Sequence, residues 1–312
     1  MRAIIVKEFG AADQLILASL SDPRPGPGEL VLDVEAAGVG LVDVLQRRGY
    51  LGAAARGYVP GLEAAGVVAA VGPGSNTQLV GKKVLAWGQG AYAQKFVAKS
   101  SAIVELPDVV SPDTAVALGI NALVAQLSLD RAGVKPGERV LVRGASGGIG
   151  ATAAQLAVLA GAVVTAVTNT QNAEAVASLG VQHVKRRGVD ESPQGPFDVI
   201  IDPVAGEGML DLVDTLASNG RYVVNGAAAG YPPAGMAEAM LQSFSRSLTY
   251  SLFSLDSISD EMRAQTLSRL LGRVAAGEIR PVVADTLPLE DASKAHMMIE
   301  AGGTFGKVVL RP

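Results

Sequence analysis

Short apolar runs separated by turns rich in glycine and proline fill the first third of the chain. The runs Arg2–Lys7 and Glu29–Ala37 read as strands, and Asp22–Glu29 is the clearest of the turns. Strand patterns at this short spacing are typical of a compact β-barrel-like domain. One short amphipathic helix is expected at Val42–Arg48. The amino-terminal part of the chain therefore predicts a β-domain.

The pattern changes after Pro112, where Thr114–Leu129 predicts one long apolar helix. Strand and helix patterns then alternate. The expected strands are Val140–Val142, Val163–Thr168, His183–Lys185, Asp198–Asp202 and Arg221–Asn225. Such alternation is typical of an α/β fold with a parallel sheet covered by helices, so this segment predicts a doubly wound parallel sheet.

A glycine turn lies between the first of these strands and the helix that follows it. Val140–Val142 is followed by Gly144, Gly147 and Gly150. Such a turn leaves backbone N–H groups unpaired at the positive end of the helix dipole, where a pyrophosphate binds, and a Cβ would hold the phosphates away. The spacing differs from the common G-x-G-x-x-G. The strand Val163–Thr168 nevertheless completes the strand-helix-strand unit of a dinucleotide site.

The end of the second strand indicates which dinucleotide binds. NAD-selective sites place Asp or Glu there, about 20 residues beyond the glycines, to bind the ribose 2′-hydroxyl. This strand ends in Thr168, Asn169 and Thr170, and the next one is followed by the basic run Lys185–Arg187. NADPH is therefore the expected cofactor, because no carboxylate would repel its 2′-phosphate. The competing interpretation of the basic run is a solvated turn.

Composition excludes several functions. The 312 residues suffice for two domains, and the absence of cysteine removes disulfides, thiol nucleophiles and thiolate metal sites. With only two histidines, His183 and His296, no metal site is expected. The net charge of −4 argues against a nucleic-acid partner. No apolar run is long enough to span a membrane and no signal-peptide pattern is present, so we expect a cytoplasmic protein.

Seven motifs in a fixed order resemble those of a known family. They are Gly38–Asp43, Pro60–Gly66, Gly90–Ala93, Gly137–Gly150, Phe197–Asp202, Asn219–Arg221 and Gly302–Leu310. In this order the chain resembles the medium-chain dehydrogenase/reductase superfamily, specifically its zinc-independent quinone oxidoreductase branch, which includes zeta-crystallin-like proteins.

The resemblance implies a GroES-like β-barrel catalytic domain that clasps a Rossmann NADP(H)-binding domain. The catalytic domain would comprise residues 1–115 and 254–312, and the Rossmann domain residues 116–253. The active site and the nicotinamide would lie in the cleft between them. A homodimer joined through the last Rossmann strand, Ser247–Phe253, is also implied.

The chain departs from the family at positions that line the substrate cleft. Zinc-binding relatives have Cys at the position of Gly40 and His at that of Leu62, so a zinc site is excluded on ligand chemistry. The quinone reductases have Asn at Gly40 and Tyr near Leu45 and near Leu51, so three polar groups are missing here.

The resemblance also assigns site residues. The expected cofactor-binding residues are Asn121, Gly144, Ala145, Ser146, Gly147, Gly148, Ile149, Gly150, Thr168, Asn169, Arg187, Val204, Gly226, Ala227 and Lys307. The expected substrate-cleft residues are Gly40, Asp43, Tyr50 and Leu62. Tyr50 is the candidate catalytic proton donor, with an ordinary loop tyrosine as the competing interpretation and solvent as the alternative, favoured source of the proton.

Two carboxylates and a histidine are interpreted as structural. Asp43 and Glu63 follow the family pattern, and we expect them to be partly buried and paired with Arg47 or Arg48, because an unpaired buried carboxylate is costly. His296 lies on an amphipathic helix and is expected to pack rather than to act as an acid.

These features predict a zinc-independent NADPH-dependent oxidoreductase that transfers hydride to a small-molecule quinone or other α,β-unsaturated carbonyl (enone). Such chemistry needs a protein that positions the reactants and excludes water. An enoyl reductase of a biosynthetic pathway is the alternative within the same class. An NADPH-binding structural or redox-sensing protein without turnover is the alternative from another class, which the missing polar groups favour.

Overall fold

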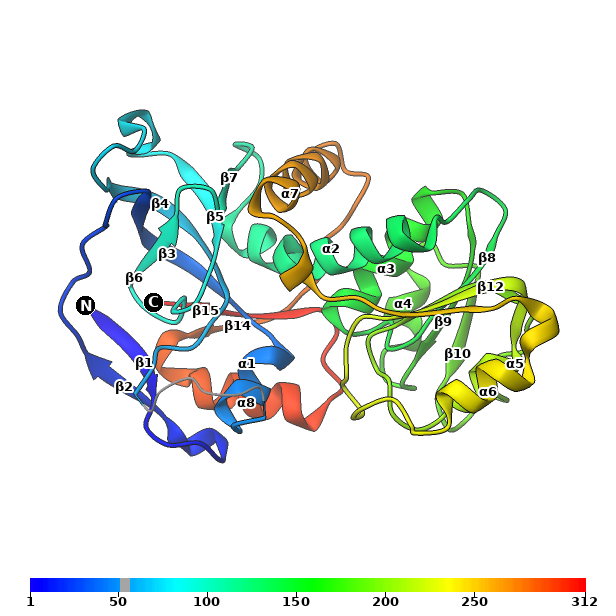
Figure 1. Ribbon diagram of the computed structural model, residues 1–312. Coiled ribbons are helices and arrows are strands. Elements are labelled where there is room, and N and C mark those ends of the chain that lie inside the picture. Colours follow the sequence, from blue (N-terminus) through cyan, green and yellow to red (C-terminus); the bar gives the residue numbers. More distant parts are fainter. Residues whose placement is uncertain (51–56) are drawn as a thin grey trace. The chain divides into compact units, whose positions relative to one another are not determined.

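The computed structural model describes residues 1–50 and 57–312, which fall into two compact units (Figure 1). Unit 1 comprises Met1–Ile120 and Ser259–Pro312, and unit 2 comprises Asn121–Ile258. The sequence pattern predicts the corresponding boundaries at 115/116 and 253/254. Within the described ranges, no helix is both long and apolar enough to cross a bilayer.

Unit 1 is built on a seven-stranded sheet in the order β14-β15-β3-β4-β5-β7, with β6 paired to β3, and on the hairpin β1-β2. Its strands are β1 (Arg2–Val6), β2 (Leu15–Ser19), β3 (Glu29–Val39), β4 (Glu63–Val71), β5 (Lys83–Trp87), β6 (Lys95–Lys99), β7 (Ile103–Glu105), β14 (Val283–Pro288) and β15 (Lys307–Arg311). Its α-helices are α1 (Leu41–Arg47), α7 (Asp260–Ala275) and α8 (Ala292–Ala301), and its 3₁₀ turns are Ala12–Gln14, Thr77–Leu79 and Leu289–Asp291.

The long strand β3 organises this sheet. β4 pairs along one edge of it, whereas the other edge is shared between β6, opposite residues 29–33, and β15, opposite residues 37–39. Two register shifts in the β3–β4 pair bend the strand, which lets the sheet curl. Alternate residues Leu30, Leu32 and Val34 face the same core as Phe96.

Helix α2 (Pro112–Ala132) differs from the single regular helix that the sequence predicted, because it breaks at Gly119 (φ 22°, ψ −130°). The Glu63 carboxylate enters the break and accepts a hydrogen bond from the Ile120 N–H at 2.7 Å. A Cβ on residue 119 would lie 1.8 Å from Glu63 Oε2. The break therefore supplies a donor to a buried carboxylate that would otherwise lack one.

Unit 2 contains six parallel strands in the order β10-β9-β8-β11-β12-β13. They are β8 (Arg139–Val142), β9 (Val163–Thr168), β10 (His183–Arg186), β11 (Phe197–Asp202), β12 (Leu216–Val224) and β13 (Thr249–Leu252). Counted from β8, this order is 3-2-1-4-5-6, as in dinucleotide-binding sheets, so the predicted doubly wound sheet is confirmed.

Helices connect most of these strands (Figure 1). They are α3 (Gly148–Leu159), α4 (Ala173–Ala177), α5 (Met209–Asp214) and α6 (Met236–Gln242), with 3₁₀ turns at Phe244–Arg246 and Leu255–Ser257. β10 and β11 are instead joined by residues 187–196, which contain no helix. The parallel arrangement brings the carboxyl ends of β8, β9, β11 and β12 to one edge of the sheet, where ligands of such folds bind.

Candidate functional site

The glycine turn occupies the carboxyl end of β8, and the structure shows why each glycine is there. A Cβ on residue 150 would lie 2.2 Å from the carbonyl oxygen of Gly144, so the helix can approach the turn only with glycine at this position. Gly144 itself has a φ of 60°. Gly147 caps α3, is exposed, and would place a Cβ no closer than 3.4 Å to the protein, which leaves open space beside the first N–H groups of the helix.

Several other predicted cofactor residues adjoin the turn. A Cβ on residue 148 would lie 2.0 Å from the Asn121 side-chain amide, and one on Gly144 would lie 2.7 Å from Val204 Cγ2. Both Asn121 and Val204 therefore contact the turn. Ala145, Ser146 and Ile149 complete it, and Ala145 donates its N–H to the Val167 carbonyl of β9 at 2.9 Å.

The loops that follow β11 and β12 are joined to each other beside this turn. The Ala229 N–H binds the Val204 carbonyl at 2.8 Å, and a Cβ on Gly226 would lie 2.5 Å from the Pro203 carbonyl oxygen. Ala227 lies next to Gly226 in the second loop. The structure thus brings Val204, Gly226 and Ala227 to the same edge as the glycines.

Asp202 holds the first of these loops in place, a role that the sequence reasoning missed. This buried carboxylate accepts hydrogen bonds from the backbone N–H groups of Val204 and Ala205, from Arg143 Nη1 and from the Tyr222 hydroxyl. Its position at the end of β11, at the edge where ligands bind, is the signal that the sequence offered. Burial and, to a lesser degree, the neighbouring Asp202 carboxylate raise the pKa of Tyr222 well above its usual range, so the phenol stays protonated and donates.

The ends of β9 and β10 carry the residues predicted to select NADPH. Arg186 lies opposite Thr168, and the Arg187 N–H donates to the Thr168 carbonyl at 2.7 Å. Arg186 is bound to Asp190, whereas the exposed Arg187 side chain has no ion-pair partner within residues 1–50 and 57–312. Asn169 accepts from the Asn172 N–H at 2.9 Å. Among the described residues, Arg187 therefore offers an unpaired positive charge next to the end of β9, where the strand carries no carboxylate.

Two buried polar atoms at this edge lack a partner in the part of the chain that the structure describes. They are Thr168 Oγ1, at the end of β9, and Asn225 Oδ1, just beyond β12. An unpaired buried polar atom costs free energy, and such groups in native proteins bind water or a ligand. Together with the open space at Gly147, they fit a nicotinamide dinucleotide across the carboxyl edge of the sheet. Asn225 was not among the sequence-predicted residues.

In unit 1, Asp43 lies beside Gly40 at the start of α1. Its Oδ2 accepts from the Gly40 N–H at 2.8 Å and from the Tyr92 hydroxyl at 3.0 Å. Burial raises the pKa of Asp43 to about 6, and the two hydrogen bonds and the nearby Lys307 only partly oppose this rise. The carboxyl group is therefore poised to change its charge close to neutral pH.

Glu63 and Lys307 form a buried ion pair, which corrects the prediction that Glu63 pairs with an arginine. Glu63 binds the Lys307 amine at 2.5 Å rather than an arginine, because the β15–β3 register places Lys307 beside Gly38 and Gly40. Both side chains are at most 5% exposed. The amine of Lys307 is thus held by a carboxylate inside unit 1, and its contact with the cofactor stays a prediction.

Arg47 was also expected to pair with Asp43 or Glu63, but it binds Glu300 of α8 instead, as does Arg48. The cause is that α1 and α8 pack against each other, which brings the two arginines to Glu300. His296, on the same helix α8, is fully buried, and its Nε2 lies 3.3 Å from the Tyr92 hydroxyl. Burial, with the charge of Arg47, lowers the pKa of His296 to about 3, so the imidazole is neutral at pH 7.

The other residues predicted to line the substrate cleft lie outside this group of buried polar side chains. Tyr50 follows α1 and is 63% exposed, and its role as the proton donor stays a prediction. Leu62 is half-buried and accepts a backbone hydrogen bond from Gly88 at 3.0 Å. Leu51 lies outside the described residues. No cluster of three metal-ligating side chains occurs in residues 1–50 and 57–312.

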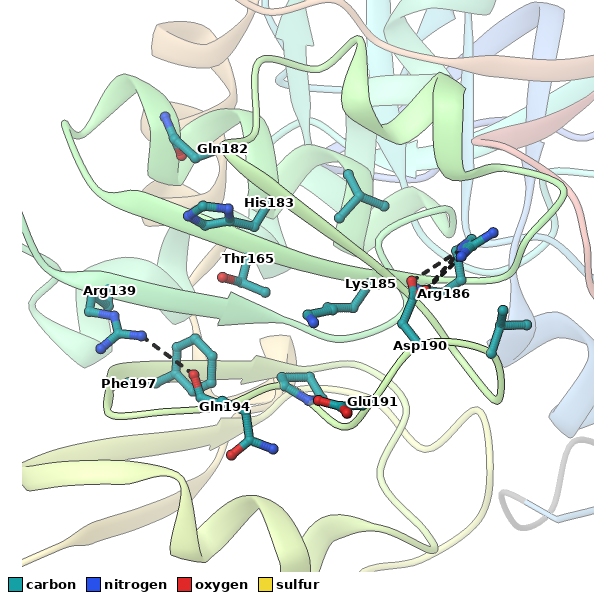
Figure 2. Close-up of a pocket in the computed structure, with 13 residues that line it drawn as sticks. Arg139, Thr165, Gln182, His183, Lys185, Arg186, Asp190, Glu191, Gln194 and Phe197 are labelled. Atoms are coloured by element: carbon teal, nitrogen blue, oxygen red, sulfur yellow. Dashed lines mark hydrogen bonds and ion pairs between the residues drawn. The ribbon is translucent and has the colours of Figure 1, made fainter.

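A separate surface pocket of about 970 Å³ opens along β9 and β10 (Figure 2). Thr165, His183 and Lys185 line it, together with Arg139, whose guanidinium lies 5.5 Å from the centre of the Phe197 ring. The link between β10 and β11, which contains no helix, forms part of the pocket wall. No residue of the glycine turn lines it, so it is distinct from the predicted cofactor site.

The fold and the turn define a two-unit dinucleotide-binding protein of the α/β class. Residues 26–108 match the alcohol dehydrogenase GroES-like domain, and residues 156–310 match the zinc-binding dehydrogenase family. The chain is 30% identical over 325 residues to the quinone oxidoreductase of Lama guanicoe, covering 99% of this chain and 97% of that protein. It therefore belongs to the quinone oxidoreductase branch of the medium-chain dehydrogenase/reductase superfamily.

Two further similarities bear on function. The chain is 30% identical over 319 residues to a phenolphthiocerol/phthiocerol polyketide synthase of Mycobacterium tuberculosis, a match that covers 98% of this chain but only 14% of that much longer protein. A mycobacterial protein solved in complex with NADPH has the same fold, with a TM-score of 0.93, 29% identity and complete coverage of both chains.

Proposed function

We propose that this protein is a zinc-independent, NADPH-dependent reductase of quinones or other α,β-unsaturated carbonyl compounds. The observation that carries the proposal is the glycine turn of unit 2, with its open space at Gly147 and the orphaned Thr168 Oγ1 and Asn225 Oδ1 around it. Membership of an oxidoreductase family supports the reaction class. When bound, NADPH would supply the hydride; the protein supplies position and electrostatics.

The chain's own residues account for cofactor binding as follows. The N–H groups at the start of α3 would receive the pyrophosphate, and Asn121 and Val204 would limit its position from either side of the turn. Arg187 would pair with the 2′-phosphate at the end of β10, because its exposed side chain has no ion-pair partner in the part of the chain that the structure describes. The related mycobacterial structure with NADPH supports the same choice.

Zinc independence rests on ligand chemistry. The chain has no cysteine, and Gly40 and Leu62, at the two positions where zinc-binding relatives have ligands, offer no donor side chain. An electrophilic carbonyl must then be polarised by hydrogen-bond donors and not by a metal. In unit 1 the polar groups nearest Gly40 are Asp43 and Lys307, and Tyr50 is the donor that the sequence proposes.

A second candidate is reduction of an enoyl thioester, itself an α,β-unsaturated carbonyl. The similarity to a stretch of a polyketide synthase favours it. A third is NADPH binding without turnover, as a structural or redox-sensing protein, which the apolar residues at Gly40 and Leu45 favour. The three differ in which acceptor, if any, oxidises NADPH.

The deciding experiment is a panel of acceptors. NADPH oxidation is followed by absorbance with 1,4-benzoquinone, 2-cyclohexen-1-one and crotonyl-CoA, and NADPH affinity is measured in parallel by fluorescence titration. Turnover of the quinone or the enone supports the main proposal, and turnover of crotonyl-CoA alone supports the enoyl reductase. Tight NADPH binding without turnover of any acceptor would leave only the third candidate.

We also propose a cytoplasmic homodimer joined through β13. This strand is the edge of the sheet in unit 2, and it carries the exposed side chain of Leu252 (62%). An unpaired strand edge favours pairing with a second copy, which would satisfy its backbone groups. Light scattering of the wild type and of a Ser251→Pro variant tests this, because proline removes a backbone donor from the edge.

A further inference from the structure

The surface pocket of unit 2 lies against one side of the parallel sheet (Figure 2). Arg139 of β8 is opposite Val163 of β9, and Thr165 of β9 is opposite His183 of β10. Side chains two residues apart on a strand point to the same face of a sheet. One side of the sheet therefore presents Arg139, Val163, Thr165, His183 and Lys185, and we call this part of it the open face.

The open face differs from the rest of the same side of the sheet. At Leu141 this side is apolar and belongs to the same buried core as Met209 of α5 and Met236 of α6. On the open face, in contrast, His183 is exposed and Val163 is 37% exposed. Parallel sheets usually carry apolar side chains on both faces, because helices cover both. The polar side chains of the open face are suited instead to contact with water or with a polar ligand.

Among the described residues, five charged side chains line the pocket, and two of them neutralise each other. Asp190 accepts three hydrogen bonds from the Arg186 guanidinium, at 2.7 to 3.2 Å, and one from the Arg186 N–H at 2.6 Å. Lys185 is half-buried and forms no hydrogen bond or ion pair within residues 1–50 and 57–312. Of the described residues that line the pocket, only Glu191 then opposes the positive charges of Lys185 and Arg139.

The Arg139 guanidinium is held in place but keeps donors for a ligand. It lies 5.5 Å from the centre of the buried Phe197 ring, and its Nη2 donates one long hydrogen bond, of 3.4 Å, to the Gln194 carbonyl. A guanidinium has several N–H donors in one fixed plane, and an aromatic ring beneath it orients that plane. Arg139 can therefore bind a carboxylate or a phosphate through two N–H groups at once.

The two cations are separated across the open face. Arg139 lies level with Val163 and Lys185 level with Val167, so they are two strands and four residues apart. With strands about 4.8 Å apart and a rise of about 3.3 Å per residue, their Cα atoms are about 16 Å apart. Both side chains are long, and the pocket has a volume of about 970 Å³. An elongated small molecule therefore has room to contact both cations at once.

We propose that this pocket binds an elongated organic dianion, with one acidic group on Arg139 and the other on Lys185. The acidic groups are carboxylates or phosphates, both of which arginine and lysine bind. The middle of the ligand lies over Thr165 and His183, which the open face presents between the two cations. Neither Arg187 nor the glycine turn lines the pocket. The site is therefore separate from the cofactor site, and the proposal does not depend on the reductase function.

The test is a calorimetric titration of the full-length protein with suberate, which has a carboxylate at each end. Octanoate, with the same number of carbon atoms but one carboxylate, is the matched ligand. Suberate should bind with a Kd tighter than about 10 mM and at least about tenfold tighter than octanoate, because only the dianion reaches both cations. Added salt should weaken this binding. A parallel titration with 6-phosphogluconate shows whether a phosphate is preferred at one end, and binding of either dianion supports the proposal.

Three variants give the expected effect a sign. Arg139→Gln and Lys185→Gln should each weaken suberate binding at least about threefold, because each removes one of the two cations. Glu191→Gln should tighten binding about twofold or more, because it removes the carboxylate that repels the ligand. A gain in affinity cannot result from a loss of folding. Arg187→Gln is the matched control, since it removes an exposed arginine outside the pocket and should leave suberate binding unchanged.

Four results would overturn the proposal. They are a Kd weaker than about 10 mM for both dianions, equal affinities for suberate and octanoate, unchanged suberate affinity in both Arg139→Gln and Lys185→Gln, and loss of suberate binding in Arg187→Gln, which would place the anion in the cofactor site. Circular dichroism of each variant checks that the fold is retained. Failure of every acceptor to oxidise NADPH would refute the reductase function and leave this pocket unaffected.

Discussion

Asp43 and His296 should make opposite contributions to the pH dependence of unit 1 stability. Folding raises the pKa of Asp43 from 3.8 to about 6, so between these values the folded state holds a proton that the unfolded chain has released. Its contribution to stability therefore falls as pH rises through this window. Folding lowers the pKa of His296 from 6.5 to about 3, so the unfolded chain holds the extra proton, and this contribution rises with pH.

The magnitude follows from linkage. One proton of difference changes the free energy of unfolding by about 1.4 kcal/mol per pH unit, so the two slopes cancel where the windows overlap, from pH 3.8 to about 6. In Asp43→Asn, stability should rise with pH by about 1.4 kcal/mol per unit relative to the wild type. In His296→Gln it should fall with pH by the same amount. The double variant should run parallel to the wild type.

Urea unfolding followed by tryptophan fluorescence measures this directly. The only tryptophan of the chain, Trp87, is buried in unit 1 and so reports on the unit that contains both groups. The contributions of all other titrating groups to the free energy of unfolding cancel when a variant is compared with the wild type. If the free energy of unfolding of both single variants changed with pH as that of the wild type does between pH of about 4 and 6, the opposite pKa shifts of Asp43 and His296 would be refuted.

Three further predictions follow from the described contacts. Gly147→Val should abolish NADPH binding and leave the fold intact, because the added Cβ would lie 3.4 Å from its nearest protein atom. Gly150→Ala should instead lower stability, because its Cβ would lie 2.2 Å from the Gly144 carbonyl. Calorimetry measures NADPH binding and circular dichroism measures the fold. Arg187→Gln should weaken the affinity for NADPH at least about tenfold, or about 1.4 kcal/mol, and leave the affinity for NADH unchanged. Fluorescence titration measures both affinities, with Arg186→Gln as the control because the wild-type Arg186 side chain is bound to Asp190. Lys307→Met should destabilise unit 1 by about 3–5 kcal/mol by leaving Glu63 buried and unpaired, and adding Glu63→Gln should restore most of this loss in urea unfolding.

The arrangement of unit 2 could be read from the sequence because its signals are local. The buried strand Val140–Val142, the glycines after it and the helix form one continuous stretch, and parallel strands bring their carboxyl ends together by topology alone. The orphaned Asn225 lies at the same edge but escaped notice. Its Nδ2 is held by Ser128, which is 97 residues away, so no local pattern indicates that its oxygen remains free.

The polar pairs of unit 1 could not be read in the same way. Two buried carboxylates clearly needed cations, and Arg47 and Arg48 were the nearest in sequence. The partners were instead decided by strand register, since Val308 lies opposite Val39 and this places Lys307 next to Glu63, 244 residues away. The break at Gly119 has the same origin, because it depends on a carboxylate 57 residues before Ile120. Long-range packing of this kind overrides local expectation.

The last prediction concerns residue 40, a glycine that has no side chain. The quinone reductases that the chain resembles have Asn there, and Gly40→Asn should be tolerated by the fold. The backbone is extended (φ −124°, ψ 162°), a Cβ would lie no closer than 3.6 Å to its neighbours, and Asn is a favourable cap for α1. The new side chain would lie beside Asp43 and Lys307. Urea unfolding of Gly40→Asn should give a free energy of unfolding equal to that of the wild type or roughly a few tenths of a kcal/mol higher, because Asn caps a helix slightly better than Gly. A clear loss of stability would mean that the added side chain disturbs the buried Asp43 and Lys307.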